Sequence, residues 1–213
     1  MKTAAILLLA FTLCSTASWT QNITSKKTIV QNAISRGTDQ GTDLPFFSTP
    51  ADAEKIISNI MGAMGLESTF RVREAHVPNV EAKIRHRERY ILYNPGFINQ
   101  VNEATRNKWA SIFILAHEVG HHLEGHTLLD ISSRPDIELE ADEFAGFALC
   151  KMGATLQQAQ LAMYYISTAA PSKTHPGRAD RLAAIEKGWD KAESQMTGVG
   201  YDSAASILNA NQN

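Results

Sequence analysis

Residues 105–124 read TRNKWASIFILAHEVGHHLE, and the fold is expected to form around this stretch. Its apolar residues recur at the spacing of an amphipathic helix, which predicts one long helix that ends at Gly125. The predicted core positions are Trp109, Ile112, Phe113, Ala116 and Leu123. The stretch therefore predicts a helix that packs by an apolar face.

The helix contains His117-Glu118-Val119-Gly120-His121, an HExxH motif. Residues four apart on a helix share one face, so the two imidazoles can bind one zinc ion at about 2.0–2.1 Å each. Glu118 can curve toward a metal-bound water, take its proton and pass it to a leaving amine. Gly120 either keeps this face uncluttered or marks close packing. The alternative is a surface helix with incidental histidines.

Catalytic zinc needs a third protein ligand and an open fourth position. The downstream candidates are His122, His126, Glu138, Glu140 and Asp142. His122 is one step round the helix from His121 and points elsewhere. Gly125 and His126 each stand one residue out of register with the HExxHxxGxxH pattern of metzincins, so that arrangement is excluded.

Glu138 fits the third position better. The predicted helix 136–152 is long enough to pack across the first, and it carries Glu138 and Asp142 on one face. Glu138 can then reach the metal, while Asp142 accepts a hydrogen bond from the outer nitrogen of a ligating histidine. Glu140 lies on another face and is expected to be a solvated charge. A salt-bridged helix start is the alternative, since acidic residues favour a first turn.

These motifs, followed by His175-Pro176 and Arg181-Leu182, resemble the zinc endopeptidase family of the CAAX prenyl proteases and the heat-shock protease HtpX. The resemblance covers roughly residues 91–185. Its specific part is the pairing of HExxH with the ExxAD motif at 138–142, and the His-Pro and Arg element is weaker by itself. It implies that Glu138 is the third ligand and that Asp142 is the acid behind a ligating histidine.

The resemblance also implies that His175 and Arg181 lie near the cleft. There they would bind the oxyanion of the tetrahedral intermediate or cover the metal in a resting state. Without the resemblance, His175 would be an exposed loop histidine and Arg181 a surface charge. The best-known members are integral membrane proteins, whereas this chain is similar to smaller exported relatives, so a prenylated substrate is not implied.

The first residues indicate export. Met1-Lys2 supplies a positive start, and residues 4–13 form an apolar run too short to span a bilayer, so 1–20 is expected to be a signal peptide. We expect no transmembrane segment after its removal, and a periplasmic or secreted location in a bacterial envelope. Lipid anchoring at Cys14 is the minor alternative, because Leu13 stands where a lipoprotein signal has a small residue.

Composition narrows the function classes. The formal net charge is −2, and no basic cluster is concentrated enough to bind nucleic acid. Hydrophobic residues make up 44% of the chain, which supports a packed core. Removal of the signal leaves Cys150 as the single cysteine, so an intrachain disulfide is excluded, and we expect Cys150 to be a small core residue.

The expected fold class is α+β, a mainly helical, zincin-like domain with a small β-sheet. Alternation predicts strands at 70–73, 79–85 and 89–93, and their short connections make the sheet antiparallel or mixed. Further helices are predicted at 51–64, capped by Thr49-Pro50, and at 98–103, 155–169 and 177–189. The organisation is then a signal peptide at 1–20, a flexible linker at 21–49, a metallopeptidase domain at 50–191 and a flexible tail at 192–213.

The function predicted from these features is a zinc-dependent endopeptidase that acts on peptide or protein substrates among exported or envelope proteins. The strand at 89–93 is expected to be an edge strand that pairs with an extended substrate. Two alternatives stay open. One is a zinc-bound, protease-like chaperone or regulator of envelope protein quality control with weak or no proteolysis. The other is a binding domain whose zinc is structural, with His175 or His126 as the closing ligand.

Overall fold

The computed structural model describes residues 44–128 and 134–198. The predicted signal peptide with Cys14, residues 21–43 of the predicted linker and the tail beyond 198 lie outside the described residues. Within the described ranges the chain forms six α-helices and three β-strands, an α+β fold with more helix than strand. The expected fold class is confirmed at this level.

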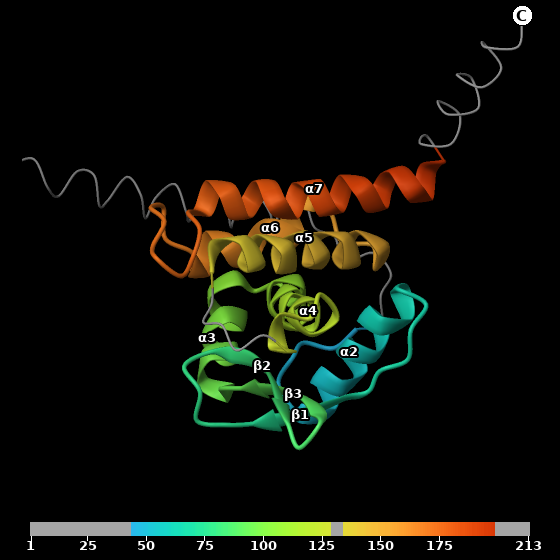
Figure 1. Cartoon of the computed structure of the whole chain (residues 1–213). Helices are drawn as coiled ribbons and strands as arrows, with labels where there is room; N and C mark the ends of the chain where they lie inside the picture. Colours follow the sequence, from blue (N-terminus) through green and yellow to red (C-terminus); the bar gives the residue numbers. More distant parts are fainter. Residues whose placement is uncertain (1–43, 129–133, 199–213) are drawn as a thin grey trace, which may run out of the picture.

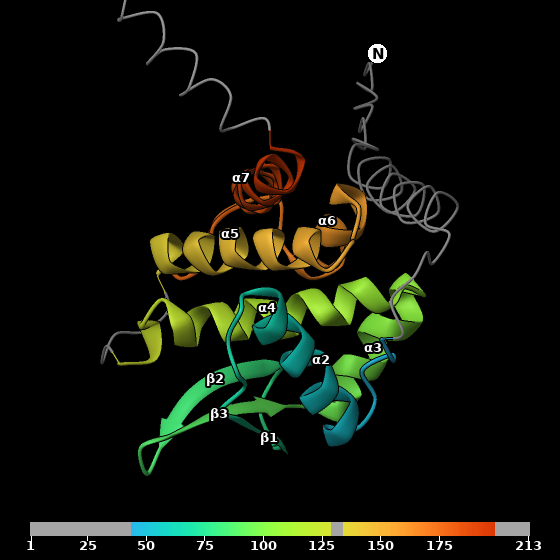
Figure 2. The same ribbon diagram turned by 90° about the vertical axis from the view of Figure 1, so that its right-hand side faces the viewer.

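The elements stack in layers (Figures 1 and 2). From one side to the other these are α7 (Arg178–Thr197), α5 (Pro135–Lys151) with α6 (Leu156–Ile166), α4 (Lys108–Leu123) and the sheet. Two further helices, α2 (Pro50–Ala63) and α3 (Pro95–Thr105), flank α4 and the sheet. The helix that carries the HExxH motif is thus the central element of the fold.

Helix α4 is buried on all sides rather than on one face. Every residue from 109 to 120 is buried, because the sheet covers one side of the helix and α5 covers the other. The predicted core positions lie inside, with Leu123 partly buried. Cys150 is a buried free cysteine, as expected. None of the helices in the described part of the chain has the length and apolarity needed to cross a bilayer.

The sheet is mixed. Its strands β1 (Phe70–Glu74), β2 (Val80–Arg85) and β3 (Glu88–Tyr93) are arranged in the order β1-β3-β2. The central strand β3 runs parallel to β1 and antiparallel to β2. The expectation that residues 89–93 form an edge strand is therefore wrong. The tight β2–β3 hairpin places β3 beside β2, and β1 occupies the remaining side of β3.

The segment 105–124 is not one helix. Helix α3 ends at Thr105, Arg106 adopts a left-handed conformation with φ 49°, and α4 begins at Lys108. The Asn107 side chain accepts a hydrogen bond from Trp109 N (2.9 Å) and so caps α4. The predicted helix 98–103 is correspondingly longer, from Pro95 to Thr105. The two predicted helices put the break at residue 104, and the structure has it at Arg106 and Asn107.

Both ends of the described fold extend past the predicted domain limits. Thr49 caps α2 in a reciprocal pair with Asp52, as the Thr49-Pro50 pattern predicts. Phe47, in the predicted linker, is fully buried and its ring packs 4.7 Å from that of Tyr93. Helix α7 continues to Thr197, beyond the predicted end at 189, because Ala192 extends the buried stripe of that helix.

Helices α5 and α7 cross closely at two glycines. A Cβ on Gly146 would overlap the carbonyl oxygen of Ile185, and a Cβ on Gly188 would overlap that of Glu143. Gly146→Ala and Gly188→Ala are each expected to lower the free energy of unfolding by at least about 1–3 kcal/mol, because the helices must separate. Urea denaturation measures the change.

Gly62→Ala provides the matched control for these two substitutions. Gly62 also lies in a helix, α2, but nothing stands within 4 Å of a Cβ placed there. The control is expected to raise stability by up to about 1 kcal/mol, the helix preference of alanine over glycine. Wild-type stability of both Gly146→Ala and Gly188→Ala would contradict the close crossing.

Candidate metal centre

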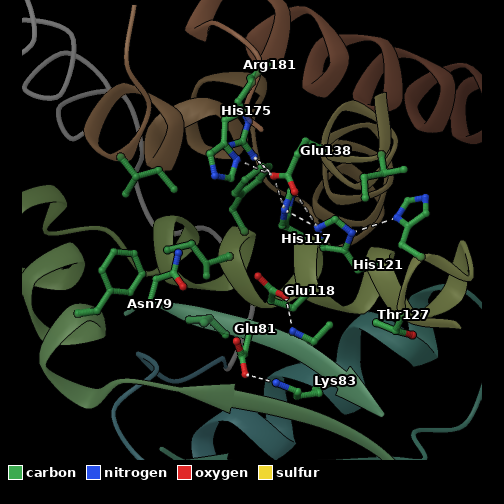
Figure 3. A pocket seen from close by; sticks show the side chains of 18 of the residues that line it. Asn79, Glu81, Lys83, His117, Glu118, His121, Thr127, Glu138, His175 and Arg181 are labelled. Atoms are coloured by element: carbon green, nitrogen blue, oxygen red, sulfur yellow. Dashed lines mark hydrogen bonds and ion pairs between the residues drawn. The ribbon is translucent and has the colours of Figure 1, made fainter. Parts of the chain in front are cut away.

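Two histidines of α4 and one glutamate of α5 converge. The Nε2 atoms of His117 and His121 lie 3.1 Å apart. Glu138 faces both, with one carboxylate oxygen 3.6 Å from His117 Nε2 and the other 3.6 Å from His121 Nε2. The three side chains point toward one another in Figure 3. The predicted ligand set is thus brought together in space.

The spacing of these atoms suits a metal ion. A zinc ion with tetrahedral bonds of about 2.0–2.1 Å separates its ligand atoms by about 3.3 Å. The observed separations of 3.1 and 3.6 Å bracket that value. His117 and Glu138 are buried and His121 is partly exposed. The group can therefore hold a metal ion, and two imidazoles with one carboxylate match a catalytic zinc site.

Close helix packing brings Glu138 to the histidines. A Cβ on Gly120 would stand 3.1 Å from Phe144 Cδ1 and 3.2 Å from Ala141 Cα, so glycine lets α5 approach α4. Pro135 begins α5, which places Glu138 in its first turn. Glu138 is only 6% exposed and faces the imidazoles. Glu138 therefore faces the histidines and is not merely an acid of a salt-bridged helix start.

Asp142 lies behind His117. Its Oδ1 is 2.9 Å from His117 Nδ1, the contact predicted for an acid behind a ligating histidine. Asp142 is fully buried and also accepts two hydrogen bonds from Arg181, at 2.6 and 2.7 Å. Arg181 is 8% exposed, so it is not a surface charge. In this geometry Arg181 orients Asp142, and its expected role toward an oxyanion stays a prediction.

The two imidazoles differ in basicity. Burial lowers the pKa of His117, but hydrogen bonds with Asp142 and Glu138 outweigh this and raise it to about 9. Burial and the charge of His117 lower the pKa of His121 to about 3. In the metal-free protein the pair is therefore expected to carry one positive charge at neutral pH, on His117, and a metal ion bound at His117 Nε2 would displace the extra proton.

Glu118 projects from α4 between the two histidines and strand β2 (Figure 3). Its Oε2 accepts a hydrogen bond of 2.6 Å from the backbone N–H of Ala82 on β2. Burial raises the pKa of the Glu118 carboxyl to about 7. A carboxyl with a pKa near neutrality is suited to accept and return a proton at neutral pH.

A cleft of about 790 Å³ joins these groups. Its walls include the metal-binding atoms, Glu118 and the edge strand β2 from Val80 to Ile84. Apolar side chains also line it, namely Phe97, Phe113, Ile114, Ile137, Met163 and Ile166. An extended chain that enters the cleft can therefore contact the edge strand and the metal centre together.

His175 lies at the cleft, as expected. Its Nδ1 is 3.5 Å from Glu138 Oε2, and its side chain is 56% exposed. It comes from the loop before α7 and stands beside Arg181 in Figure 3. The geometry places His175 next to the Glu138 carboxylate, and its role there stays a prediction.

His126 and Glu140, which the sequence pattern did not assign to the site, contact it. His126 Nδ1 lies 3.0 Å from His121 Nδ1, and its Nε2 lies 2.8 Å from Glu140 Oε2. Both of its ring nitrogens thus face away from the metal position, so a closing ligand at His126 is not supported. His122 points elsewhere, as predicted, and donates from Nε2 to the Tyr90 carbonyl (2.8 Å). No local motif marks His126, because its contact arises after the turn at Gly125.

Comparisons with protein-family models, curated proteins and solved structures found no match for the chain. The function is therefore inferred from the chain's own residues, motifs and geometry.

The ion pair between Arg181 and Asp142 is expected to contribute strongly to stability. Arg181→Met removes two hydrogen bonds and one of the two cationic groups that face the fully buried Asp142, and leaves only His117 beside it, so we expect a loss of about 3 kcal/mol in the free energy of unfolding. Urea denaturation of the metal-free protein measures it.

Lys187→Met is the control for this prediction, on the same helix. The Lys187 side chain is 71% exposed where it pairs with Glu143, and loss of this pair is expected to cost less than about 1 kcal/mol. Equal losses of unfolding free energy in the two variants would mean that the buried ion pair stabilises the fold no more than the exposed one.

Proposed function

We propose that the protein is a zinc-dependent endopeptidase. The observation that carries this proposal is the convergence of His117, His121 and Glu138 at tetrahedral zinc spacing, beside Glu118 and an edge strand in one cleft. The likeness of the motifs to the HtpX type of zinc endopeptidase supports the same reaction class. An exported location and substrates among envelope proteins are part of the proposal.

Zinc, held by His117, His121 and Glu138, would supply a Lewis acid that polarises the scissile carbonyl and acidifies the attacking water. Glu118 takes the proton of that water and delivers it to the leaving amine. Its raised pKa, about 7, matches this double role at neutral pH. Asp142 keeps His117 oriented through Nδ1, so that Nε2 faces the metal.

Strand β2, rather than β3, is the strand proposed to bind substrate. The Ala82 N–H reaches Glu118 and therefore points away from β3. In an antiparallel pair every second residue directs its backbone the same way, so Val80 and Ile84 also face the cleft. An extended peptide can pair with this edge through main-chain hydrogen bonds, which tolerate many sequences.

Metal content and chelation test the proposal. Purified protein is expected to carry one zinc per chain and to cleave an unfolded protein substrate. Treatment with 1,10-phenanthroline should abolish cleavage, and added zinc should restore it. Cleavage that persists after complete zinc removal, or protein that binds no zinc, would end the proposal. Stoichiometric zinc without cleavage of any member of a peptide library would favour the chaperone or structural alternatives instead.

A further inference from the structure

His126 is buried, and both of its ring nitrogens have a partner. It begins a short 3-10 helix after α4 and is 7% exposed. The turn at Gly125, with φ 80°, reverses the chain so that the imidazole lies beside His121. Nδ1 lies 3.0 Å from His121 Nδ1, and Nε2 lies 2.8 Å from Glu140 Oε2. The three side chains form a row from the metal centre to the surface.

The chemistry of the row determines where its protons lie. His121 turns Nε2 toward His117 and Glu138, so metal binding leaves its proton on Nδ1. That proton must be donated to His126 Nδ1, which accepts only when it carries no hydrogen. The proton of His126 is then on Nε2 and is donated to Glu140, whose carboxylate can only accept. The Glu140 carboxylate, which can only accept, thus fixes the tautomers of both histidines.

We propose that His126 and Glu140 are positioning residues for the metal ligand His121. Glu140 holds His126 as the Nε2–H tautomer, and His126 holds His121 as the Nδ1–H tautomer with Nε2 free for the metal. The inference rests on the proposed zinc function and deepens it. His117 receives the same support directly from the fully buried Asp142. His121 receives it through a relay that ends at Glu140, whose side chain is 60% exposed.

Zinc affinity of the whole protein is the readout, measured by competition with a chromophoric chelator. His126→Leu removes the acceptor and is expected to weaken zinc binding about 10–100-fold, the range typical of residues behind a metal ligand. His126→Gln keeps one acceptor and one donor and should restore most of the affinity. Glu140→Ala should weaken binding about 10-fold, and Glu140→Gln, which keeps an acceptor oxygen, should weaken it less.

Asp136→Ala is the matched control. Asp136 is an exposed acid in the first turn of the same helix, paired with Arg134, and has no contact with the row. Its removal takes one negative charge from the same helix, as Glu140→Ala does, so unchanged affinity in this variant separates positioning from a general loss of charge. The unfolding of each metal-free variant is measured in parallel. If His126 had only a structural role, its substitutions would lower stability, and His126→Gln would not restore the zinc affinity lost in His126→Leu.

The outcomes separate the two proposals. Wild-type protein that binds no zinc overturns the proposed function and this inference together. Wild-type protein that binds zinc, with His126→Leu and Glu140→Ala binding it equally well, overturns only the inference. Equal weakening by leucine and glutamine at position 126 also overturns it. If His126→Leu fails to fold, the comparison of Glu140→Ala with Glu140→Gln decides, because the Glu140 side chain is largely exposed and its loss should not disturb folding.

Discussion

Glutamine in place of Glu118 is expected to lower kcat/KM for peptide hydrolysis by about 10²–10⁴-fold, the usual contribution of a general base. The amide has no basic oxygen to take the proton of water. Its oxygen can still accept the hydrogen bond from Ala82 N–H, so the fold and the cleft should be retained. Zinc stoichiometry should match the wild type, because the metal-binding group consists of His117, His121 and Glu138.

The control for this prediction is Glu81→Gln. Glu81 lines the same cleft from β2, so its substitution removes one negative charge there without touching the metal-binding group. We expect at most a small change in kcat/KM. Full activity in Glu118→Gln would contradict the assignment of the base. Loss of zinc from that variant would show that Glu118 holds the metal, which is a different site from the one proposed.

Loss of the Glu138 carboxylate is the second large expected effect. Glu138→Gln should weaken zinc binding by more than the roughly 10–100-fold typical of residues behind a ligand, because it removes a ligand. Glutamine has the shape of glutamate, and the Glu138 side chain faces both imidazoles at 3.6 Å. The loss of zinc affinity therefore measures the contribution of the negative charge. Equilibrium dialysis against a zinc buffer measures it, and peptide cleavage should fall in parallel.

Glu143→Gln gives the matched comparison on α5. Glu143 bonds to the exposed Lys187 rather than to the metal-binding group, so zinc affinity should stay at the wild-type value. Unchanged zinc affinity in Glu138→Gln would mean that another residue is the third ligand. His175, whose Nδ1 lies 3.5 Å from Glu138 Oε2, would then be the first to test.

Helical spacing alone predicted much of the metal centre. His117 and His121 share a face because they are one turn apart, and Glu138 and Asp142 share a face of α5 for the same reason. These relations hold for any helix that carries these residues. Their contacts with one another, such as Asp142 Oδ1 at 2.9 Å from His117 Nδ1, were predicted on the assumption that the two helices pack together.

Other features could not be predicted from local patterns. The edge position of β2 depends on β1 pairing with β3 across the intervening hairpin. The left-handed Arg106 puts the break between α3 and α4 two residues later than the apolar pattern did. Arg181 and Phe47 lie in polar or weakly patterned segments, yet both are buried because distant elements cover them. Glu140 is largely exposed, as expected, but its bond to His126 was not predicted.

The sequence by itself determined which side chains share a helix face, because the α-helical repeat is local and needs no partner. It thereby predicted the three side chains that the structure brings together and the glutamate that we propose as the base. Only the tertiary structure decided which strand borders the cleft and which partners lie behind the ligands. Those features depend on contacts between residues far apart in the chain. They form only when the layers pack, and glycines at 120, 146 and 188 let them pack closely.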